Sequence, residues 1–278
     1  MSIASKFPST CEISSSSSTS CLYLEWYQPQ HQSATRAPCP KKTVVIVPGF
    51  WVDPTSFDEV VHGLQGRGYR ATTIRLPSRG CEPPTKTLVD DARAVHDEVD
   101  KLVQEGYDVT VVMHSAGGLI APEGLQGLQA PDLAKAGGVT GLLYITASCM
   151  SVGEEAPPAL WFLFEGDYLW AKDPRETLFN DLPAAEADMA TKRLKHYPAH
   201  NYNAKLSQEP WKDVPSVCLE CYKDATISLD LQSIFAAKIP GCDVEICNSG
   251  HSPFLSQPKK VVGAIIKAAE KPNKGSGL

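Results

Sequence analysis

Three side chains of the types used in nucleophilic catalysis occur in the chain in the order serine, acid, histidine. Ser115 lies in the segment MHSAGG, where a run of β-branched residues leads directly into a serine flanked by small residues. This pattern predicts a strand that ends in a sharp turn, with the serine held out of the sheet as a nucleophile. Met113 occupies the position where the GxSxG pattern has glycine. Taken alone, therefore, the segment fits a non-catalytic glycine-rich turn equally well.

Asp224 and His251 are the candidate partners of this serine. Asp224 follows a strand-like run at residues 214–221, and His251 follows another at residues 243–247. Because ligands of open α/β sheets bind at the carboxyl ends of the strands, both side chains are expected at the same edge as Ser115. His251 would then accept the proton of Ser115, and Asp224 would orient the imidazole for acyl transfer. Three other carboxylates remain open as the acid, namely Glu154, Glu155 and Asp167.

An oxyanion site is expected in the loop after an earlier strand. Residues 42–47 (KTVVIV) predict that strand, and PGFW follows at residues 48–51. Gly49 lets the backbone approach a substrate closely. The amides of Phe50 and Ala116 would point together at the negative charge that develops on the substrate oxygen. A plain turn with two core aromatic residues is the alternative interpretation of this loop.

The remaining pattern supplies elements that would position these groups. Strand-like and helical segments alternate along the chain, which predicts an α/β fold with a mainly parallel central sheet flanked by helices. Residues 88–102 show apolar residues three and four apart, as expected for one buried helix face. Further strands are expected at residues 69–76, 108–114 and 138–146, and further helices at 53–64, 119–125 and 258–269.

The alternation breaks at residues 148–209, which are interpreted as a helical cap inserted after the sixth strand. Aromatic residues crowd its first part, and Asp181 with Pro183 predicts a helix that runs to about His196. The aromatic cluster favours the interior of the cap over a substrate wall, although it can serve as both. The candidate substrate contacts are Trp51, His114, Trp161 and Phe164. His114 is also expected to pack under the serine turn or toward the oxyanion loop.

The domain organisation is predicted from changes in composition and pattern along the chain. Residues 42–147 and 210–278 are expected to form the core. Residues 1–41 carry serine runs and few aliphatic residues, which predicts a mostly mobile extension with an edge strand at 21–27. The formal net charge of −6 and the lack of long apolar runs argue against nucleic acid or a membrane as partner. A cytoplasmic enzyme acting on a small molecule is expected, and a homodimer is left open.

Metal sites are disfavoured by spacing. The nine cysteines are interpreted as reduced thiols. Cys218 and Cys221 lie three apart on one predicted strand, so they face opposite sides of the sheet and cannot share a zinc ion with Cys242 and Cys247. His196 and His200 are interpreted as surface histidines, because a proline lies between them. The expected chemistry needs neither a metal nor an organic cofactor.

Several blocks in order resemble the α/β-hydrolase superfamily, close to the branch of plant methylesterases and hydroxynitrile lyases with their fungal and bacterial relatives. The resemblance covers roughly residues 42–271 and implies a triad of Ser115, Asp224 and His251, with the amides of Phe50 and Ala116 as oxyanion hole. The matching blocks are PGFW at 48–51, LPSRG at 76–80, MHSAGG at 113–118, FNDLP at 179–183, CYKDATI at 221–227 and SGHSPFLSQP at 249–258.

The triad predicts hydrolysis of a carboxylic ester by acyl transfer, and the aromatic cluster of the cap predicts an apolar or aromatic acyl group. Two alternatives remain open, since fold and triad do not fix function. One is a lyase or cyclase that breaks or forms a carbon–carbon bond, and the other is a ligand receptor without hydrolysis. Lyases of the resembling branch carry a lysine beside the histidine, whereas Ser252 follows His251 in this chain.

Overall fold

The structure, a computed structural model, describes residues 41–129, 137–155, 159–203 and 205–272. The chain divides at residue 40 into two units, and the described residues belong to the second. The N-terminal extension expected at residues 1–41 lies almost entirely outside the described residues, as does the strand expected at 21–27. Among the described helices, none is long and apolar enough to cross a membrane.

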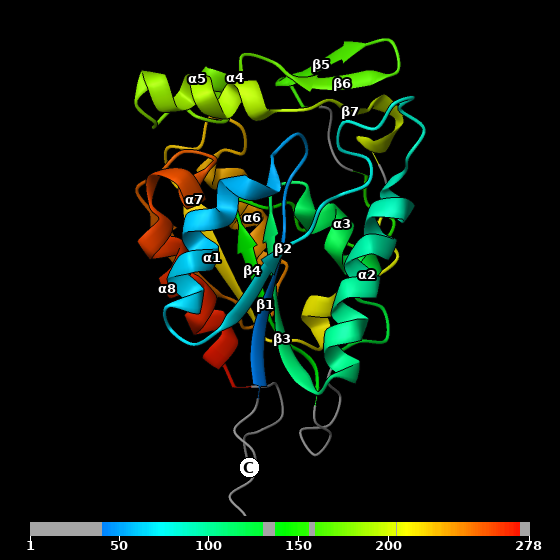
Figure 1. The fold of residues 1–278 in the computed structure, drawn as a ribbon, viewed down its shortest axis with the longest axis vertical. Helices are drawn as coiled ribbons and strands as arrows, with labels where there is room; N and C mark the ends of the chain where they lie inside the picture. Colours follow the sequence, from blue (N-terminus) through cyan, green and yellow to red (C-terminus); the bar gives the residue numbers. More distant parts are fainter. Residues whose placement is uncertain (1–40, 130–136, 156–158, 204, 273–278) are drawn as a thin grey trace, which may run out of the picture. The chain divides into compact units, whose positions relative to one another are not determined.

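A six-stranded parallel sheet forms the centre of this unit, in the order β2-β1-β3-β4-β8-β9 (Figure 1). The predicted α/β class with a mainly parallel sheet is therefore confirmed. The order reverses between β1 and β3, and loops that leave such a point diverge to leave a crevice at the carboxyl edge. The strands are β1 (Lys41–Val47), β2 (Arg70–Thr73), β3 (Tyr107–His114), β4 (Gly138–Ile145), β8 (Ser216–Cys221) and β9 (Asp243–Cys247).

Helices cover both faces of the sheet, which explains the nearly continuous apolar runs in β1 and β3. Side chains of β1 alternate between the two faces: Val44 and Ile46 pack in one apolar core, and Val45 and Val47 in the other. Helices α1 (Asp58–Gln65) and α8 (Pro258–Glu270) cover the first face, and α2 (Leu88–Gln104) and α3 (Gly117–Gly124) cover the second (Figure 1).

Short elements connect these layers at the carboxyl edge. Asp53 caps the 3-10 helix η1 (Pro54–Phe57), because its carboxylate accepts the N–H of Thr55 at 3.0 Å. Helix α6 (Leu229–Ala237) was not expected from the sequence, because its apolar residues do not form a single stripe. The other short elements at this edge are α7 (Pro253–Ser256) and the 3-10 helix η3 (Pro210–Lys212).

The cap differs from the expected helical insertion. It follows β4, the fourth strand of the described sheet rather than the sixth, and it contains a three-stranded antiparallel sheet, β5-β6-β7. FLFE and YLWA form a hairpin because Gly166, at φ +61°, supplies the tight turn between them. The cap elements are β5 (Phe162–Glu165), β6 (Tyr168–Ala171), α4 (Pro174–Thr177), α5 (Ala184–Arg193), β7 (Tyr197–Pro198) and the 3-10 helix η2 (Ala199–Asn201).

Helix α5 is shorter than the predicted helix of residues 181–196. The backbone of Leu194 is already extended, with ψ of 145°, and strand β7 begins three residues later at Tyr197. Pro198 disfavours helical backbone in the residue before it, so the chain leaves the helix early. Figure 1 shows α4, α5 and the hairpin lying beyond the carboxyl edge of the sheet.

Candidate active site

Ser115 occupies a sharp turn between β3 and α3. Its φ is +51°, a left-handed conformation that costs a non-glycine residue free energy and that clusters at functional sites. The Ser115 N–H donates to the carbonyl of Ile145 at 3.2 Å, and its own carbonyl accepts the N–H of Ser148 at 3.1 Å. Thr146, at the end of the neighbouring strand β4, has φ of +42°. Both strand ends are therefore held in uncommon conformations by the packing around them.

The two glycines after Ala116 are required because neighbouring backbone leaves no room for a side chain at either position. A Cβ on Gly117 would lie 2.5 Å from the carbonyl oxygen of Val47, and one on Gly118 would lie 1.9 Å from that of Ser148. Met113 is fully buried in the core beside α2 and α3. Position 113, where the GxSxG pattern has glycine, is therefore occupied by a buried methionine side chain. The sharp turn at Ser115 forms without a glycine at that position.

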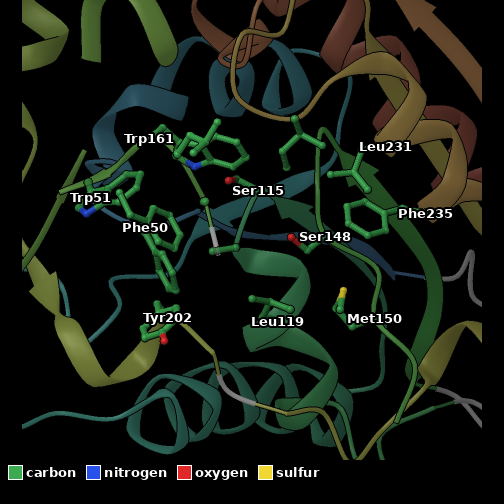
Figure 2. A pocket seen from close by; sticks show the side chains of 15 residues that line it. Phe50, Trp51, Ser115, Leu119, Ser148, Met150, Trp161, Tyr202, Leu231 and Phe235 are labelled. Atoms are coloured by element: carbon green, nitrogen blue, oxygen red, sulfur yellow. The ribbon is translucent and has the colours of Figure 1, made fainter. Parts of the chain in front are cut away.

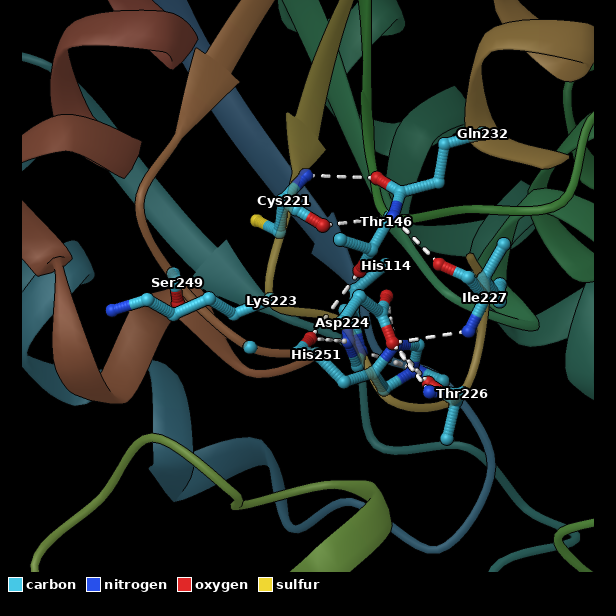
Figure 3. Close-up of polar contacts among 12 residues, drawn as sticks. His114, Thr146, Cys221, Lys223, Asp224, Thr226, Ile227, Gln232, Ser249 and His251 are labelled. Carbon is cyan, nitrogen blue, oxygen red and sulfur yellow. Dashed lines mark hydrogen bonds and ion pairs between the residues drawn. The ribbon is translucent and has the colours of Figure 1, made fainter. Parts of the chain in front are cut away.

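Asp224 and His251 form a buried pair (Figure 3). His251 Nδ1 lies 2.8 Å from Asp224 Oδ2, and the two side chains are 2% and 0% exposed. The other oxygen, Oδ1, accepts the N–H of Thr226 at 2.7 Å, its hydroxyl at 2.6 Å and the N–H of Ile227 at 3.0 Å. The Asp224 carboxylate accepts a hydrogen bond from Nδ1–H of His251. In the neutral imidazole, Nε2 then carries no proton and can accept one.

His114 links the loops around the serine. Its Nδ1 accepts the N–H of Gly49 at 3.3 Å, and its Nε2 donates to the carbonyl of His251 at 3.0 Å. These two contacts require the neutral tautomer with the proton on Nε2. Burial, together with the nearby His251, holds the pKa of His114 well below 6.5. His114 therefore lies under the turn and faces the oxyanion loop, as expected, but it does not line the cavity as the expected substrate contact would.

Phe50 and Ala116, whose backbone amides are the expected oxyanion hole, both line the cavity. Within the described ranges, neither N–H donates to any acceptor. Buried amides are rarely left without a partner, so two of them at one cavity indicate a place for a ligand oxygen. Trp51, the next residue of the loop, has φ of +66°, and its carbonyl accepts Arg79 Nε at 2.9 Å and the N–H of Lys195 at 3.2 Å.

Arg79 fixes this loop to the cap. Its guanidinium pairs with Asp53 at 3.0 Å and also donates to the carbonyl of Arg193, while its side chain is only 8% exposed. Burial lowers the pKa of Arg79, and Asp53 opposes that shift. Since Gly49 is bonded on one side of Phe50 and Trp51 on the other, the Phe50 amide is held in one orientation.

The FNDLP segment connects the cap to both loops of the Asp224–His251 pair. Asn180 Nδ2 donates to the carbonyl of Lys223 at 2.8 Å. Asp181 Oδ2 accepts the N–H of Gly250 at 2.8 Å and the hydroxyl of Ser249 at 2.9 Å. Sequence reasoning matched this segment to the family without giving it a role. In the structure it joins the loops that carry the acid and the histidine.

A cavity of about 280 Å³ opens in front of the serine (Figure 2). Of the expected substrate contacts, Trp51 and Trp161 line it. Phe164 does not, because its ring is 48% exposed and packs edge-on against Phe162 and Tyr202 instead. The lining residues are Phe50, Trp51, Ser115, Ala116, Leu119, Ser148, Met150, Ala159, Leu160, Trp161, Phe162, Tyr202, Ile227, Leu231 and Phe235.

Among the described residues that line the cavity, none has a charged side chain, and the hydroxyl groups come from Ser115, Ser148 and Tyr202. Most of the apolar lining residues were missed by sequence reasoning. Leu231 and Phe235 belong to α6, and Tyr202 follows the cap strand β7. These residues come from segments distant in the chain, so no local pattern identifies them.

The alternative acids and candidate metal ligands lie elsewhere. Glu154 pairs with Lys238, Glu155 pairs with Lys205, and Asp167 is exposed. His200 is exposed, but the surface position expected for His196 is wrong. His196 is buried beside the rings of Tyr168 and Trp170, and its Nε2 lies 2.9 Å from Glu82. Among the described residues, no three His, Cys, Asp or Glu side chains are grouped to hold a metal ion.

Comparisons with known proteins show which family the chain resembles. A family model described as alpha/beta hydrolase family matches residues 44–264. The protein named Alpha/beta hydrolase nvfD from Aspergillus novofumigatus is 31% identical over 242 residues, covering 82% of this chain and 97% of the relative. Methylesterase 17 from Arabidopsis thaliana is 26% identical over 245 residues, covering 74% of this chain and 83% of the relative.

Solved structures show the same fold at lower identity. The pyrethroid hydrolase PytH is 22% identical with a TM-score of 0.68, over 83% of this chain and 98% of that one. Polyneuridine aldehyde esterase is 14% identical with a TM-score of 0.67, over 83% of this chain and all (100%) of that one. The family match and the fungal relative together show that the chain belongs to the alpha/beta hydrolase family.

Proposed function

We propose that this protein is a serine esterase that cleaves a neutral carboxylic ester with an apolar or aromatic acyl group. One observation carries the proposal: the serine of the sharp turn faces an apolar cavity lined by the two residues whose amides are unpaired within the described ranges, and the neighbouring loops hold a buried Asp224–His251 pair. Relatives named as a methylesterase and an esterase support ester cleavage.

The reaction would proceed in two acyl-transfer steps. Ser115 attacks the ester carbonyl while Nε2 of His251 accepts the hydroxyl proton, and Asp224 stabilises the imidazolium that forms. The amides of Phe50 and Ala116 donate to the oxyanion, each contributing about 2–4 kcal/mol. His251 then protonates the leaving alcohol. Water, activated by the same imidazole, attacks the acyl enzyme and releases the acid.

The cavity lining supports a neutral, apolar substrate. Because its described residues hold no charged side chain, a charged substrate would lose its hydration without a compensating ion pair. A volume of about 280 Å³ lies at the lower end of small-molecule sites. The hydroxyls of Ser148 and Tyr202 can each hydrogen-bond one oxygen of a neutral substrate. We therefore expect a small, largely apolar ester.

A fluorophosphonate probe tests the activated serine, because it reacts with serines that an enzyme has made nucleophilic. The parent protein should label, and Ser115→Ala should abolish labelling. Ser148→Ala is the matched control, since Ser148 lines the same cavity outside the sharp turn, and it should keep labelling. A folded parent that does not label, or a Ser115→Ala protein that still labels, would exclude the proposed nucleophile.

A panel of p-nitrophenyl esters graded by acyl size tests the substrate class. The value of kcat/KM should rise from acetyl to medium-length and aromatic acyl groups, because larger groups bury more apolar surface in the cavity. Esters whose acyl group ends in a carboxylate should be cleaved more slowly than neutral esters of equal length. A preference for acetyl or for the charged esters would contradict the proposed substrate class.

A further inference from the structure

Strands β8 and β9 bring four cysteines together in two pairs on opposite faces of the sheet. Cys218 belongs to the core on the α2 and α3 face, with Cys242 packed against that core. Cys221 and Cys247 belong to the core on the opposite face, where they are register partners on the two strands. The catalytic proposal uses neither pair. Each pair therefore needs its own explanation.

The sulfurs of Cys218 and Cys242 lie 3.0 Å apart. This is only about 1 Å longer than a covalent S–S bond of about 2.05 Å. Both cysteines are free thiols in the structure. A small movement of the two side chains would thus bring the sulfurs to bonding distance.

The two pairs differ in access to solvent. Cys242 lies in the connection before β9 and is partly exposed, whereas Cys218 is 5% exposed. Cys221 and Cys247 are 0% and 2% exposed. A reagent from solvent can therefore reach one sulfur of the first pair and neither sulfur of the second.

The neighbouring Cys218 thiol favours the reactive thiolate at Cys242. The Cys218 thiol, which can donate a hydrogen bond to a thiolate at Cys242, lowers the pKa of Cys242; burial opposes this shift, and the nearby Lys271 ammonium supports it. Lys271 Nζ is held there by the carbonyls of Gly241 at 2.8 Å and Ser216 at 3.1 Å. Redox-sensitive cysteines share this combination of partial exposure, thiolate character and a neighbouring second thiol.

We propose that Cys218 and Cys242 are a redox modification site, which small-molecule disulfides such as oxidised glutathione convert to a reversible intramolecular disulfide. The proposal does not depend on the proposed esterase function.

The reaction balances as two thiol–disulfide exchanges. The Cys242 thiolate attacks one sulfur of oxidised glutathione, forms a mixed disulfide and releases one glutathione thiolate. Cys218 then loses its proton to solvent and attacks the Cys242 sulfur, which displaces the second glutathione thiolate. The protein loses two electrons and two protons, and one glutathione disulfide is reduced to two glutathione thiols.

The bond would close a loop that belongs to the candidate active site. Residues 218–242 include Asp224 and all of α6, from which Leu231 and Phe235 reach the cavity. A covalent closure restricts the unfolded chain, so oxidation should raise the melting temperature by roughly 5 °C. Dithiothreitol should reverse this change.

Peptide mapping of the full chain tests the proposal. The protein is incubated with oxidised glutathione, its remaining thiols are alkylated, and it is cleaved on the amino side of aspartate. Cleavage before Asp243 separates Cys242 from Cys247. We expect peptide 213–223 to be linked to peptide 230–242, and this link should disappear when dithiothreitol is added before alkylation.

Serine variants identify the sulfurs on peptide 213–223, which holds both Cys218 and Cys221. The link and the rise in melting temperature should persist in Cys221→Ser and be lost in Cys218→Ser and in Cys242→Ser. Absence of the link in the parent, a dominant link to peptide 243–278, or loss of the link in Cys221→Ser would overturn the proposal.

Discussion

The catalytic edge of the sheet and the aromatic side of the cap are held by different forces. At the catalytic edge, the Asp224 carboxylate takes hydrogen bonds from Thr226, Ile227 and His251, all at 3.0 Å or less. The aromatic cluster of the cap, defined as Trp161, Phe162, Phe164 and Tyr202, is held by ring contacts with centroids 5.3–6.3 Å apart. Hydrogen bonds demand fixed geometry, whereas ring contacts permit several arrangements.

This difference predicts that the edge of the sheet governs the reaction rate and that the cap governs which substrate binds. The groups proposed to move protons are positioned by buried polar contacts, so a small displacement is costly. The cavity wall formed by the cap is partly exposed and apolar, so it can change shape at little cost. Polar contacts tie the cap to the core at several places along its length, among them those of Asp181, Leu169 and His196. Substitutions should therefore affect kcat at the edge and KM at the cap.

The largest effect is expected for Asp224→Asn. The amide keeps the shape of the side chain but loses the charge that fixes the His251 tautomer, so kcat should fall about 10⁴-fold. Turnover of a p-nitrophenyl ester measures this loss. Asp167→Asn, at the exposed turn of the cap hairpin, is the control and should leave kcat unchanged. A loss of less than about tenfold in Asp224→Asn would show that another group is the acid.

His114→Gln should reduce kcat by about 10²-fold, because it disturbs both the oxyanion loop and the His251 backbone. It should also change how stability depends on pH. The folded protein keeps His114 neutral, with its pKa well below 6.5, whereas the unfolded chain binds a proton near 6.5. This group's contribution to the free energy of unfolding is therefore constant above about pH 6.5 and decreases below it, by up to about 1.4 kcal/mol per pH unit.

Urea unfolding between pH 5 and 8 measures that pH dependence. The decrease below pH 6.5 should be smaller in His114→Gln than in the parent. His200→Gln is the control, since His200 is exposed and its replacement should leave the slope unchanged. Equal slopes in the parent and His114→Gln would contradict the neutral buried imidazole.

Arg79→Lys should lower kcat about tenfold with little change in KM. A lysine keeps the charge but has a single nitrogen, whereas Arg79 uses one nitrogen for Asp53 and another for the Trp51 carbonyl, so the Phe50 amide loses its fixed orientation. Steady-state kinetics on one ester separate kcat from KM. Arg75→Lys, at an exposed position four residues earlier, should match the parent. An effect on KM alone would place Arg79 in substrate binding instead.

The smallest effect is expected in the cap. Trp161→Ala should raise KM about fivefold for an aromatic ester, because the cavity loses apolar contact area there. Phe164→Ala is the matched comparison, and it should change KM less than twofold because Phe164 lies outside the cavity lining. A larger effect at Phe164 than at Trp161 would mean that the cap closes differently around a substrate.

Sequence patterns predicted the regular part of the molecule well. Parallel strands such as β1 and β3 are buried on both faces, so their apolar runs are visible in the sequence. The positions expected for Asp224 and His251 follow from the same rule, because each residue comes shortly after a strand. Glycine spacing around Ser115 also has a local cause, since a side chain there would meet neighbouring backbone.

The parts that were missed depend on tertiary contacts. The cap hairpin depends on pairing of FLFE with YLWA, and both segments were read as cap aromatics without strand periodicity. His196 was placed at the surface because Pro198 breaks its helical spacing to His200, but Glu82 supplies a partner from a distant loop. The contributions of Leu231 and Phe235 to the cavity depend on how α6 packs, which its own sequence does not show.

The left-handed backbone at Ser115 and Thr146 has a consequence for how the protein can evolve. Glycine adopts such φ values without penalty, so Ser115→Gly would relieve about 1 kcal/mol of strain while removing the nucleophile. Thr146→Gly would relieve similar strain but lose the hydroxyl that donates to the His251 carbonyl at 3.3 Å. Selection for thermal stability alone would therefore favour glycine at Ser115 and Thr146. A related protein with glycine at both positions would be more stable but would lack the proposed activity.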